Sequence, residues 1–339
     1  MEGWSYSKAG VDLKKHEEMH SIAYKAIKEI SDRLGIEINL EGYGSSVALN
    51  DMRLVMHTDG VGTKTVVLEK LGKLDVAGWD CVAMNTNDVA CAGSRPILLS
   101  DYISMPSADI EKFSRIISGI KRASEEAKVL LVGGETAILP GLANAVDVVC
   151  TVLAVKEKSE GFKGMGDIGD AIVGVRSTGP HANGYSLIRK VLQGSLEKPN
   201  VVMEGVNMGE WITRPTAIYS ELILNAIKRG LVKAAAHITG GAFSKLKRIL
   251  PPNGDAHLRL ESYDKGFEVL RKVGNISLQE MYRVFNMGIG LLLSTSSDKV
   301  DELLSFINKE GFEGFVVGNL VKGNKKVLID VKGGKRVEL

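Results

Sequence analysis

The chain has 339 residues, and 44% of them are hydrophobic, so it is long enough to form two domains with substantial cores. Its 43 basic and 41 acidic residues leave a formal net charge of +2, which gives no electrostatic reason to expect nucleic acid or an anionic membrane as a partner. No apolar run approaches the roughly 20 residues that span a bilayer. The N-terminus does not look like a signal peptide, so we expect a cytoplasmic protein.

The N-terminal half alternates predicted helices and strands. An apolar stripe predicts an amphipathic helix over residues 16–34 that ends at Gly35, and a glycine-containing loop follows at residues 41–46. The later elements, in chain order, are a strand at 53–57, a helix at 75–92, a strand at 96–104, a helix capped by Ser107 and running to 127, and buried strands at 129–132 and 146–155.

A charged and glycine-rich stretch at residues 156–170 predicts a domain junction, which divides the chain into residues 1–166 and 167–339. The second half then resumes the mixed pattern. It predicts a strand at 171–175, a helix after Gly179, a helix opened by Pro215, a helix that follows Gly241 and runs to 249, a strand at 288–294, a helix at 298–309 and two short final strands. Two mixed domains of α+β or α/β type are therefore expected.

Three cysteines, Cys81, Cys91 and Cys150, occur without the close spacing of a zinc site or a disulfide framework. We interpret all three as small buried apolar residues, and a reducing compartment fits this usage.

The segment Thr58–Lys64 has the residue types of a phosphate site. Asp59 offers a carboxylate, Gly60 and Gly62 allow backbone N–H groups to approach an anion, and Lys64 adds a positive charge. This set suits a phosphate held with magnesium, although the spacing is neither Walker A nor GxGxxG. An ordinary glycine-rich turn is the alternative.

Two further segments offer oxygen ligands. Asn87 and Asp88 lie inside an otherwise apolar predicted helix, where such residues are costly unless they have a function. Glu135 follows the predicted strand at 129–132, at the kind of position where ligand residues of α/β sheets gather. Asp59, Asp88 and Glu135 together could bind one or two magnesium ions, while a helix kink or an exposed turn is the structural alternative.

Two histidines each lie in a polar turn before a predicted helix. His181 could move protons near neutral pH, and Asn183 and Ser186 beside it could bind a polar substrate. His237 precedes Gly240 and its neighbouring glycine in the same kind of turn. An ordinary helix cap explains either turn as well, and His57 has no convincing ligand set.

Seven segments, in this order, resemble the phosphoribosylformylglycinamidine cyclo-ligase family, also called aminoimidazole ribonucleotide synthetase. They cover nearly the whole chain: residues 6–12, 58–64, 82–88, 133–136, 179–186, 237–241 and 280–286. The resemblance implies a two-domain α+β fold with a mixed α/β C-terminal domain, in which N-terminal strands of two subunits pair across a homodimer. It also implies that ATP and Mg²⁺ convert formylglycinamidine ribonucleotide to aminoimidazole ribonucleotide through a phosphorylated amide, an iminophosphate, in purine biosynthesis.

The resemblance further implies roles for individual residues. The metal would be held by Asp59, Asn87, Asp88 and Glu135, and the nucleotide would be bound by Gly44, Asp59, Gly60, Gly62, Thr63, Lys64, Asn87, Asp88 and Gly134. The substrate would be bound by Thr136, Gly179, Asn183, Tyr185, Ser186, Thr239 and Gly240. Lys64 would contact phosphate, and His181, with His237 second, would take the proton released by ring closure.

The sequence departs from the family pattern in three places: the loop at residues 41–46 has fewer glycines, His57 replaces a small residue, and Ala242 stands where a third glycine is usual. Sister enzymes are the nearest alternatives. A selenophosphate synthetase would have a reactive residue in the N-terminal glycine-rich segment, and no cysteine precedes Cys81. A thiamine-monophosphate kinase would have more aspartates at the metal, and a non-catalytic nucleotide-binding paralogue would lack acidic or histidine site residues that are present here.

Overall fold

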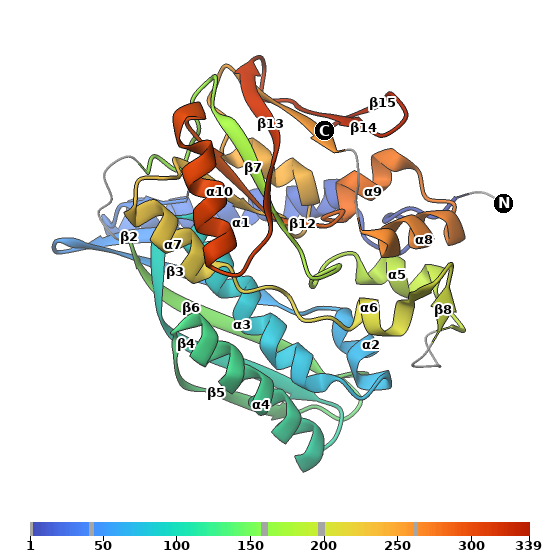
Figure 1. Cartoon of the computed structure of the whole chain (residues 1–339). Coiled ribbons are helices and arrows are strands. Elements are labelled where there is room, and N and C mark those ends of the chain that lie inside the picture. Colours follow the sequence, from blue (N-terminus) through green and yellow to red (C-terminus); the bar gives the residue numbers. More distant parts are fainter. Residues whose placement is uncertain (1–2, 41–43, 157–161, 196–200, 261–263) are drawn as a thin grey trace.

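The computed structural model describes residues 3–40, 44–156, 162–195, 201–260 and 264–339. It contains two large β-sheets, one built from the N-terminal half of the chain and one from the C-terminal half (Figure 1). The two sheets follow the predicted alternation of strands and helices, and the mixed α+β character expected from the sequence is confirmed.

The N-terminal sheet has six strands in the order β1-β2-β3-β6-β4-β5. Strands β4 and β5 run parallel because helix α4 crosses between them, and the other neighbours are antiparallel. The strand bounds are β1 (Ile38–Asn39), β2 (Ser45–Leu49), β3 (Met52–Gly60), β4 (Ser94–Met105), β5 (Leu130–Ile138) and β6 (Asp147–Lys156).

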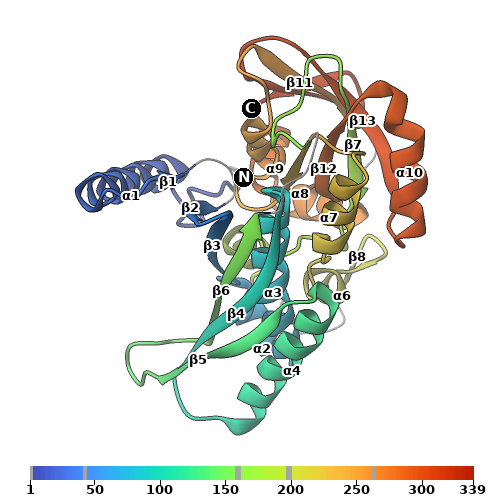
Figure 2. The same ribbon diagram turned by 90° about the vertical axis from the view of Figure 1, so that its left-hand side faces the viewer.

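Helices cover one face of this sheet, namely α2 (Lys64–Lys70), α3 (Leu74–Cys91) and α4 (Ile110–Ala127) (Figure 2). Helices α3 and α4 touch backbone to backbone, since a Cβ atom on Gly78 would lie 2.0 Å from the carbonyl oxygen of Ile116. Helix α3 also contacts α7 and β10 of the C-terminal half. It is therefore enclosed by both halves, and every residue from Asp80 to Cys91 is buried.

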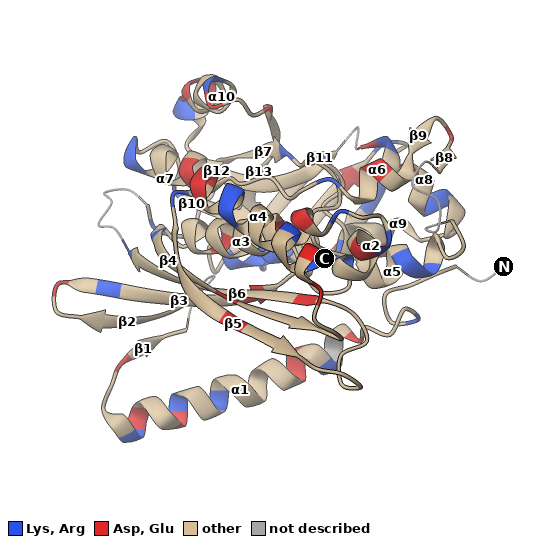
Figure 3. Cartoon of the chain, turned by 90° about the horizontal axis from the view of Figure 1, so that it is seen from below, with Lys and Arg blue, Asp and Glu red and all other residues tan. Residues whose placement is uncertain are grey.

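The opposite face of the N-terminal sheet is open, and helix α1 (Leu13–Leu34) projects away from the body of the molecule (Figure 2). The helix was predicted correctly, but its apolar stripe does not face a core in this single chain. Met19 and Ile22 on that stripe are 67% and 72% exposed. Lys, Arg, Asp and Glu residues alternate along the ribbon of this helix, so α1 carries no run of one charge (Figure 3).

The C-terminal sheet has seven strands in the order β10-β12-β7-β13-β11-β14-β15. Helix α10 packs against β7 and β13, while η1 and α9 contact strands β10, β14 and β15. The strands are β7 (Ala171–Arg176), β10 (Ala234–His237), β11 (Gly254–Leu260), β12 (Ile289–Thr295), β13 (Gly314–Lys322), β14 (Val327–Val331) and β15 (Lys335–Glu338). The helices are α5 (Tyr185–Val191), α6 (Met208–Ile212), α7 (Ser220–Lys228), η1 (Ala242–Arg248), α8 (Lys265–Val273), α9 (Leu278–Val284), η2 (Ser297–Lys299) and α10 (Val300–Lys309), with a short hairpin of β8 (Val202–Met203) and β9 (Val206–Asn207).

Several predicted element boundaries were wrong. Helix α4 is capped by Asp109, whose side chain accepts a hydrogen bond from the Lys112 N–H, and not by Ser107. Strand β5 was expected to be buried, but it is the exposed edge of its sheet. The helix expected at Pro215 begins only at Ser220, and three strands rather than two follow α10.

The interpretation of the cysteines was also wrong for two of the three. Cys81 on α3 and Cys150 on β6 form a disulfide with their Cα atoms 5.7 Å apart, whereas Cys91 is a buried free thiol as expected. No sequence pattern predicted this pairing, because the two residues are 69 positions apart. The disulfide fixes the helix layer to the centre of the sheet.

Candidate active site

The first part of the candidate site lies where strand β3 meets helix α3. Asp59 pairs with the buried Cys150 of β6, so its side chain lies on the sheet face that α3 covers. Asn85 on α3 donates a hydrogen bond of 3.1 Å to the Asp59 carbonyl oxygen. Burial raises the pKa of the Asp59 carboxyl, and the neighbouring Asp88 carboxylate raises it further. Asp59 and Asp88 therefore form a carboxyl pair that a cation would stabilise.

Asp88 is the centre of a buried polar cluster that joins the two halves of the chain. Its carboxylate lies 2.6 Å from Nδ1 of His237, 3.6 Å from Nζ of Lys245 and 3.5 Å from Nε2 of His57. Burial acts to raise the pKa of Asp88, but Lys245, His237 and His57 together hold it below its usual value. Asp88 is therefore ionised at neutral pH, while Asp59 beside it ionises less readily. Carboxyl pairs with separated pKa values are typical of active sites.

His181 lies in the second polar turn, with its ring centroid 6.2 Å from that of His237. Its side chain is fully buried, and its backbone has a φ of 59°, which is unusual for a residue with a Cβ atom. Burial lowers the pKa of His181 well below the usual value, and the nearby His237 and Lys64 lower it further. The imidazole is therefore neutral at pH 7 and can accept a proton, although a low pKa makes it a weak base.

The accessible rim of the site is built from both halves of the chain. Thr63 Oγ1, just before α2, lies 3.2 Å from Ser186 Oγ on α5. A Cβ atom on Gly240 would lie 3.3 Å from Oδ1 of Asn183, so the two histidine turns are in contact. Lys245 donates a hydrogen bond to Thr239 and also faces Asp88. The loop around Thr63 and the turns that contain His181 and His237 thus meet at one site.

The structure does not bring the residues of strand β5 to this site. Asp59 is separated from Gly134 by strands β6 and β4, which corresponds to about 14 Å at the usual strand spacing. Glu135 pairs with Tyr102 and lies on the opposite, open face of the sheet. Thr136 is exposed on the same edge strand. The expected ligand set of Asp59, Asn87, Asp88 and Glu135 is therefore not assembled in this chain.

Three other predicted site residues point into the interior. The side-chain oxygen of Asn87 accepts a hydrogen bond of 2.6 Å from the Tyr219 N–H, so it is already used in packing α3 against α7. Tyr185, expected to face substrate, is buried, and its hydroxyl donates to the Ile212 carbonyl oxygen. Lys64, expected on phosphate, is fully buried and bonded to Asp80. The residue types were suggestive, but the direction of each side chain was not visible in the sequence.

The glycines of the predicted nucleotide set occupy different surroundings. Gly62 has a φ of 62° at the tip of the loop with open space around it, as a turn that approaches a ligand requires. Gly60 packs against Val149, and Gly179 of the predicted substrate set packs against the Trp211 carbonyl oxygen. Gly44 packs against Val55, and residues 41–43 of its loop lie outside the described residues.

Sequence reasoning missed three residues of the site region. Lys245 and His57 face Asp88, although His57 had no apparent ligand set in the sequence, and Asp80 pairs with Lys64. A signal existed for Asp80, since an acid in an apolar helix needs a buried partner just as Asp88 does. Lys245 lies one helical turn after Gly241, so its side chain can reach back to the turn that precedes the helix, where it bonds to Thr239.

The residues present fit a magnesium ion held partly by a ligand. Within the described ranges, no group of three or more His, Cys, Asp or Glu residues is placed to hold a metal ion, so an all-protein cage is not formed there. Magnesium usually takes one or two carboxylates and completes its shell with water and phosphate oxygens. Asp59 and Asp88 supply two such carboxylates, and Asp59 is the one without a cationic partner at hydrogen-bond distance among the described residues.

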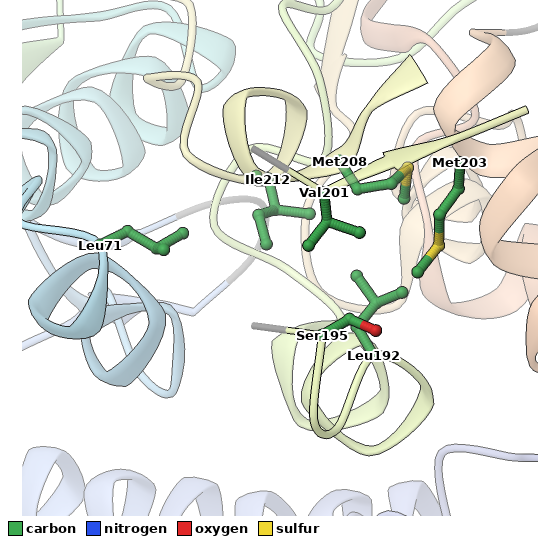
Figure 4. Close-up of a pocket in the computed structure, with 8 residues that line it drawn as sticks. Leu71, Leu192, Ser195, Val201, Met203, Met208 and Ile212 are labelled. Carbon is green, nitrogen blue, oxygen red and sulfur yellow. The ribbon is translucent and has the colours of Figure 1, made fainter. Parts of the chain in front are cut away.

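A separate small pocket lies between α2, α5 and α6. Its lining is apolar apart from Ser195 and includes Leu71, Met203 and Met208 (Figure 4). It has no titratable side chain, so it offers no chemistry comparable to the Asp88 cluster.

The fold and the site define a two-domain α+β protein with a carboxylate and histidine site at the junction of its halves. Two family models match the chain, the N-terminal domain of AIR synthase related protein over residues 44–155 and its C-terminal domain over residues 167–331. The chain therefore belongs to the AIR synthase related family.

Curated relatives with a named activity are similar to this chain over nearly its whole length. The phosphoribosylformylglycinamidine cyclo-ligase of Sulfurisphaera tokodaii is 38% identical over 305 residues, covering 90% of each chain. The protein of the same name from Methanocaldococcus jannaschii is 36% identical over 344 residues, covering 98% of this chain and 95% of the relative. Similarity of this extent covers both domains and the junction between them.

Solved structures share the fold at low sequence identity. The thiamine-monophosphate kinase of Stenotrophomonas maltophilia superposes with a TM-score of 0.63 at 18% identity, covering 88% of this chain and 92% of that one. A HypE–HypF complex gives a TM-score of 0.64 at 15% identity, covering 87% and 92%. These likenesses confirm the two-domain architecture.

Proposed function

We propose that this chain uses ATP to close the imidazole ring of aminoimidazole ribonucleotide, with formylglycinamidine ribonucleotide as its substrate. It is an enzyme of the cyclo-ligase class, as its relatives are, and this reaction belongs to purine biosynthesis. The observation that carries the proposal is the meeting of the Asp59–Thr63 loop and helix α3 with the two histidine turns, seen in the Thr63–Ser186 and Asp88–His237 contacts. A sister kinase activity has only the shared fold in its favour.

In this proposal, the loop after β3 receives the nucleotide phosphates. Gly62 and Thr63 form its accessible tip, and Asp59 and Asp88 would hold Mg²⁺, which neutralises phosphate charge when bound. Thr63 and Ser186 lie next to one another, so a phosphate at the loop is brought beside the second domain, where Asn183 and Gly240 form the adjoining rim. The substrate is proposed to lie between them.

The chemistry explains why both halves are needed. An amide oxygen is a poor leaving group, so it is first phosphorylated to an iminophosphate, and a nearby nitrogen then attacks the same carbon and displaces phosphate. Ring closure releases a proton, for which His181 is the first candidate acceptor because its imidazole is neutral. His237 is held by Asp88 through Nδ1, which suits an orienting role better than a mobile base.

Three further parts of the proposal concern the whole chain. The domains are taken as residues 1–166 and 167–339, supported by the separation of the two sheets between Lys156 and Ala171. A homodimer is supported by the open sheet face. No helix of the described chain is long and apolar enough to cross a membrane. The cytoplasmic assignment rests on the biosynthetic activity alone, since the Cys81–Cys150 disulfide removes the argument from cysteine usage.

A direct assay tests the activity. Purified protein is incubated with formylglycinamidine ribonucleotide, ATP and Mg²⁺, and aminoimidazole ribonucleotide and ADP are measured together. We expect the two products in equal amounts and no product without ATP. Consumption of ATP with phosphate appearing on another acceptor, such as thiamine monophosphate, and no imidazole product, would assign the chain to the sister kinases instead.

A further inference from the structure

Lys64 is the most deeply buried cation of the site region, and all the hydrogen bonds of its ammonium group are used. Its Nζ atom lies 2.5 Å from Oδ2 of Asp80 and 2.8 Å from each of two backbone carbonyl oxygens, those of His181 and Arg214. The side chains of Lys64 and Asp80 are both 0% exposed. An ammonium group has three donors, so none is left for a phosphate.

The partners of this ion pair lie in the other half of the chain. The second oxygen of Asp80 accepts a hydrogen bond of 2.7 Å from the Thr216 N–H, and Trp79 beside it donates to the Thr216 carbonyl oxygen. One Lys–Asp pair on α2 and α3 therefore fixes two C-terminal segments, the His181 turn and residues 214–216. Buried charges are tolerated only when they are paired and fully hydrogen-bonded, as these are.

The His181 turn needs such a contact more than most turns do. His181 has a φ of 59°, a conformation that costs energy for a residue with a Cβ atom. Among the described residues, Nδ1 of its ring has no hydrogen-bond partner, and Nε2 accepts only a long bond of 3.4 Å from the Thr178 N–H. The bond from Lys64 to the His181 carbonyl oxygen is therefore the strongest polar contact of that residue.

We propose that Lys64, paired with Asp80, is a positioning residue that holds the His181 turn in the geometry required for ring closure. This inference rests on the proposed function, because ring closure is the step that Lys64 would serve. It assigns Lys64 to ring closure and not to phosphate binding. Lys64 directly follows the Asp59–Thr63 loop, so the same residue couples the position of the phosphate loop to the position of His181.

The test compares Lys64→Met with a matched control, Lys112→Met. Lys112 also forms an ion pair from a helix of the N-terminal half, with Glu69, but its side chain is 42% exposed and both partners lie within that half. We expect Lys64→Met to lower kcat for imidazole formation at least about 10-fold. The KM for ATP and the Kd for a non-hydrolysable ATP analogue should stay within about twofold of wild type, and Lys112→Met should match wild type in all three.

A spectroscopic measurement reports the position of His181 without turnover. In protein labelled with ¹³C-histidine, the His181 ring signal is assigned by its loss in His181→Gln. Lys64→Met should shift or broaden that signal and leave the signal of His257, which lies on β11 and bonds to Asp330, unchanged. If Lys64→Met does not fold, Asp80→Asn serves, because it keeps an acceptor for the Thr216 N–H while weakening the hold on Lys64; the same kcat loss and signal shift are expected.

Two results would overturn the inference: a rise of 10-fold or more in the Kd of the ATP analogue, which would return Lys64 to the phosphate, or an unchanged His181 signal together with wild-type kcat. A failure of the proposed function looks different. In that case wild-type protein forms no imidazole product, yet the shift of the His181 signal in Lys64→Met still supports the positioning role and its absence still contradicts it.

Discussion

At the scale of single residues, the direction in which a few charged side chains point determines which of them belong to the candidate site. Asp59 and Lys64 are five positions apart in one motif, yet Asp59 faces the Asp88 cluster while Lys64 turns inward to Asp80. The motif by itself could not separate these directions. The two backbone carbonyl acceptors of Lys64 are more than 100 residues away in sequence, so no local pattern reveals them.

Asp59→Asn should remove activity while leaving the fold intact. The amide keeps an oxygen for the Gly60 N–H but removes one of the two carboxylates proposed to hold Mg²⁺, so we expect kcat to fall about 100-fold or more. The melting temperature at pH 7.5 should stay level or rise, because the repulsion between Asp59 and Asp88 is removed. Steady-state kinetics and calorimetry measure both.

Asp101→Asn is the matched control for Asp59→Asn. Asp101 lies in the same row of the sheet, two strands away from Asp59, and burial likewise raises the pKa of its carboxyl. It has no part in the Asp88 cluster, so we expect activity close to wild type. Equal losses in the two variants would mean that Asp59 acts through the sheet and not through a bound cation.

His181 should make the protein less stable in mild acid. In the unfolded chain its imidazole takes up a proton near the usual pKa of 6.5, whereas burial holds the pKa of the folded state well below that value. The unfolded state then binds more protons, so stability is lost as the pH falls through about 6.5 and further down to the folded pKa. Asp88 loses its contribution only below its ordinary carboxyl range, outside this window.

Calorimetric melting between pH 7.5 and 5 checks this dependence. The decline in melting temperature should be smaller in His181→Gln, which cannot titrate, than in wild type. His16→Gln, a change on the exposed helix α1, should keep the full decline. A wild-type decline that persists unchanged in His181→Gln would show that another group causes it.

At the scale of elements, helix α3 organises the molecule because it is covered on two sides. Its polar residues were predicted to be functional or to kink the helix, yet α3 is continuous from Leu74 to Cys91. Asp88 and Asn87 instead bond to the C-terminal half, which is why the helix tolerates them. Strand β5 shows the opposite case. Its run of apolar residues predicted a buried strand, but an edge strand on an open face shares that pattern.

The Cys81–Cys150 disulfide should stabilise the contact between α3 and the sheet. It closes a loop with a sequence separation of 69 residues, for which the loss of unfolded-chain entropy corresponds to about 4 kcal/mol. Unfolding in denaturant should therefore shift to clearly lower denaturant concentration when a reductant is present throughout. Cys91→Ala, which removes the free thiol only, should keep this sensitivity, and Cys81→Ala should abolish it. Coinciding curves with and without reductant in wild type would mean that the pair is reduced in solution.

At the scale of the whole molecule, the alternation of strands and helices was enough to predict two mixed domains, because each domain obeys the short-range pattern rules. The junction was not predictable in the same way. The contacts that join Thr63 to Ser186 and Asp88 to His237 are set by how α3 is clamped between the two sheets, and that depends on packing over the full chain. The site lies at this junction, so its membership could be predicted only in part.

The open face of the N-terminal sheet should be a dimer interface. Met56, Tyr102 and Leu130 are exposed large apolar residues on that face, and β5 beside them is an exposed edge strand. Soluble chains seldom leave such a face uncovered, and a second copy of the same face would cover it symmetrically.

Light scattering after size exclusion should give twice the chain mass of 36.6 kDa. Met56→Glu should shift the protein toward the mass of a monomer, because it places a charge in the interface. Val273→Glu, at a similarly exposed position on α8, should leave the mass of the dimer unchanged. A wild-type monomer, or a dimer that Met56→Glu leaves as tight as wild type, would place the interface elsewhere or remove it.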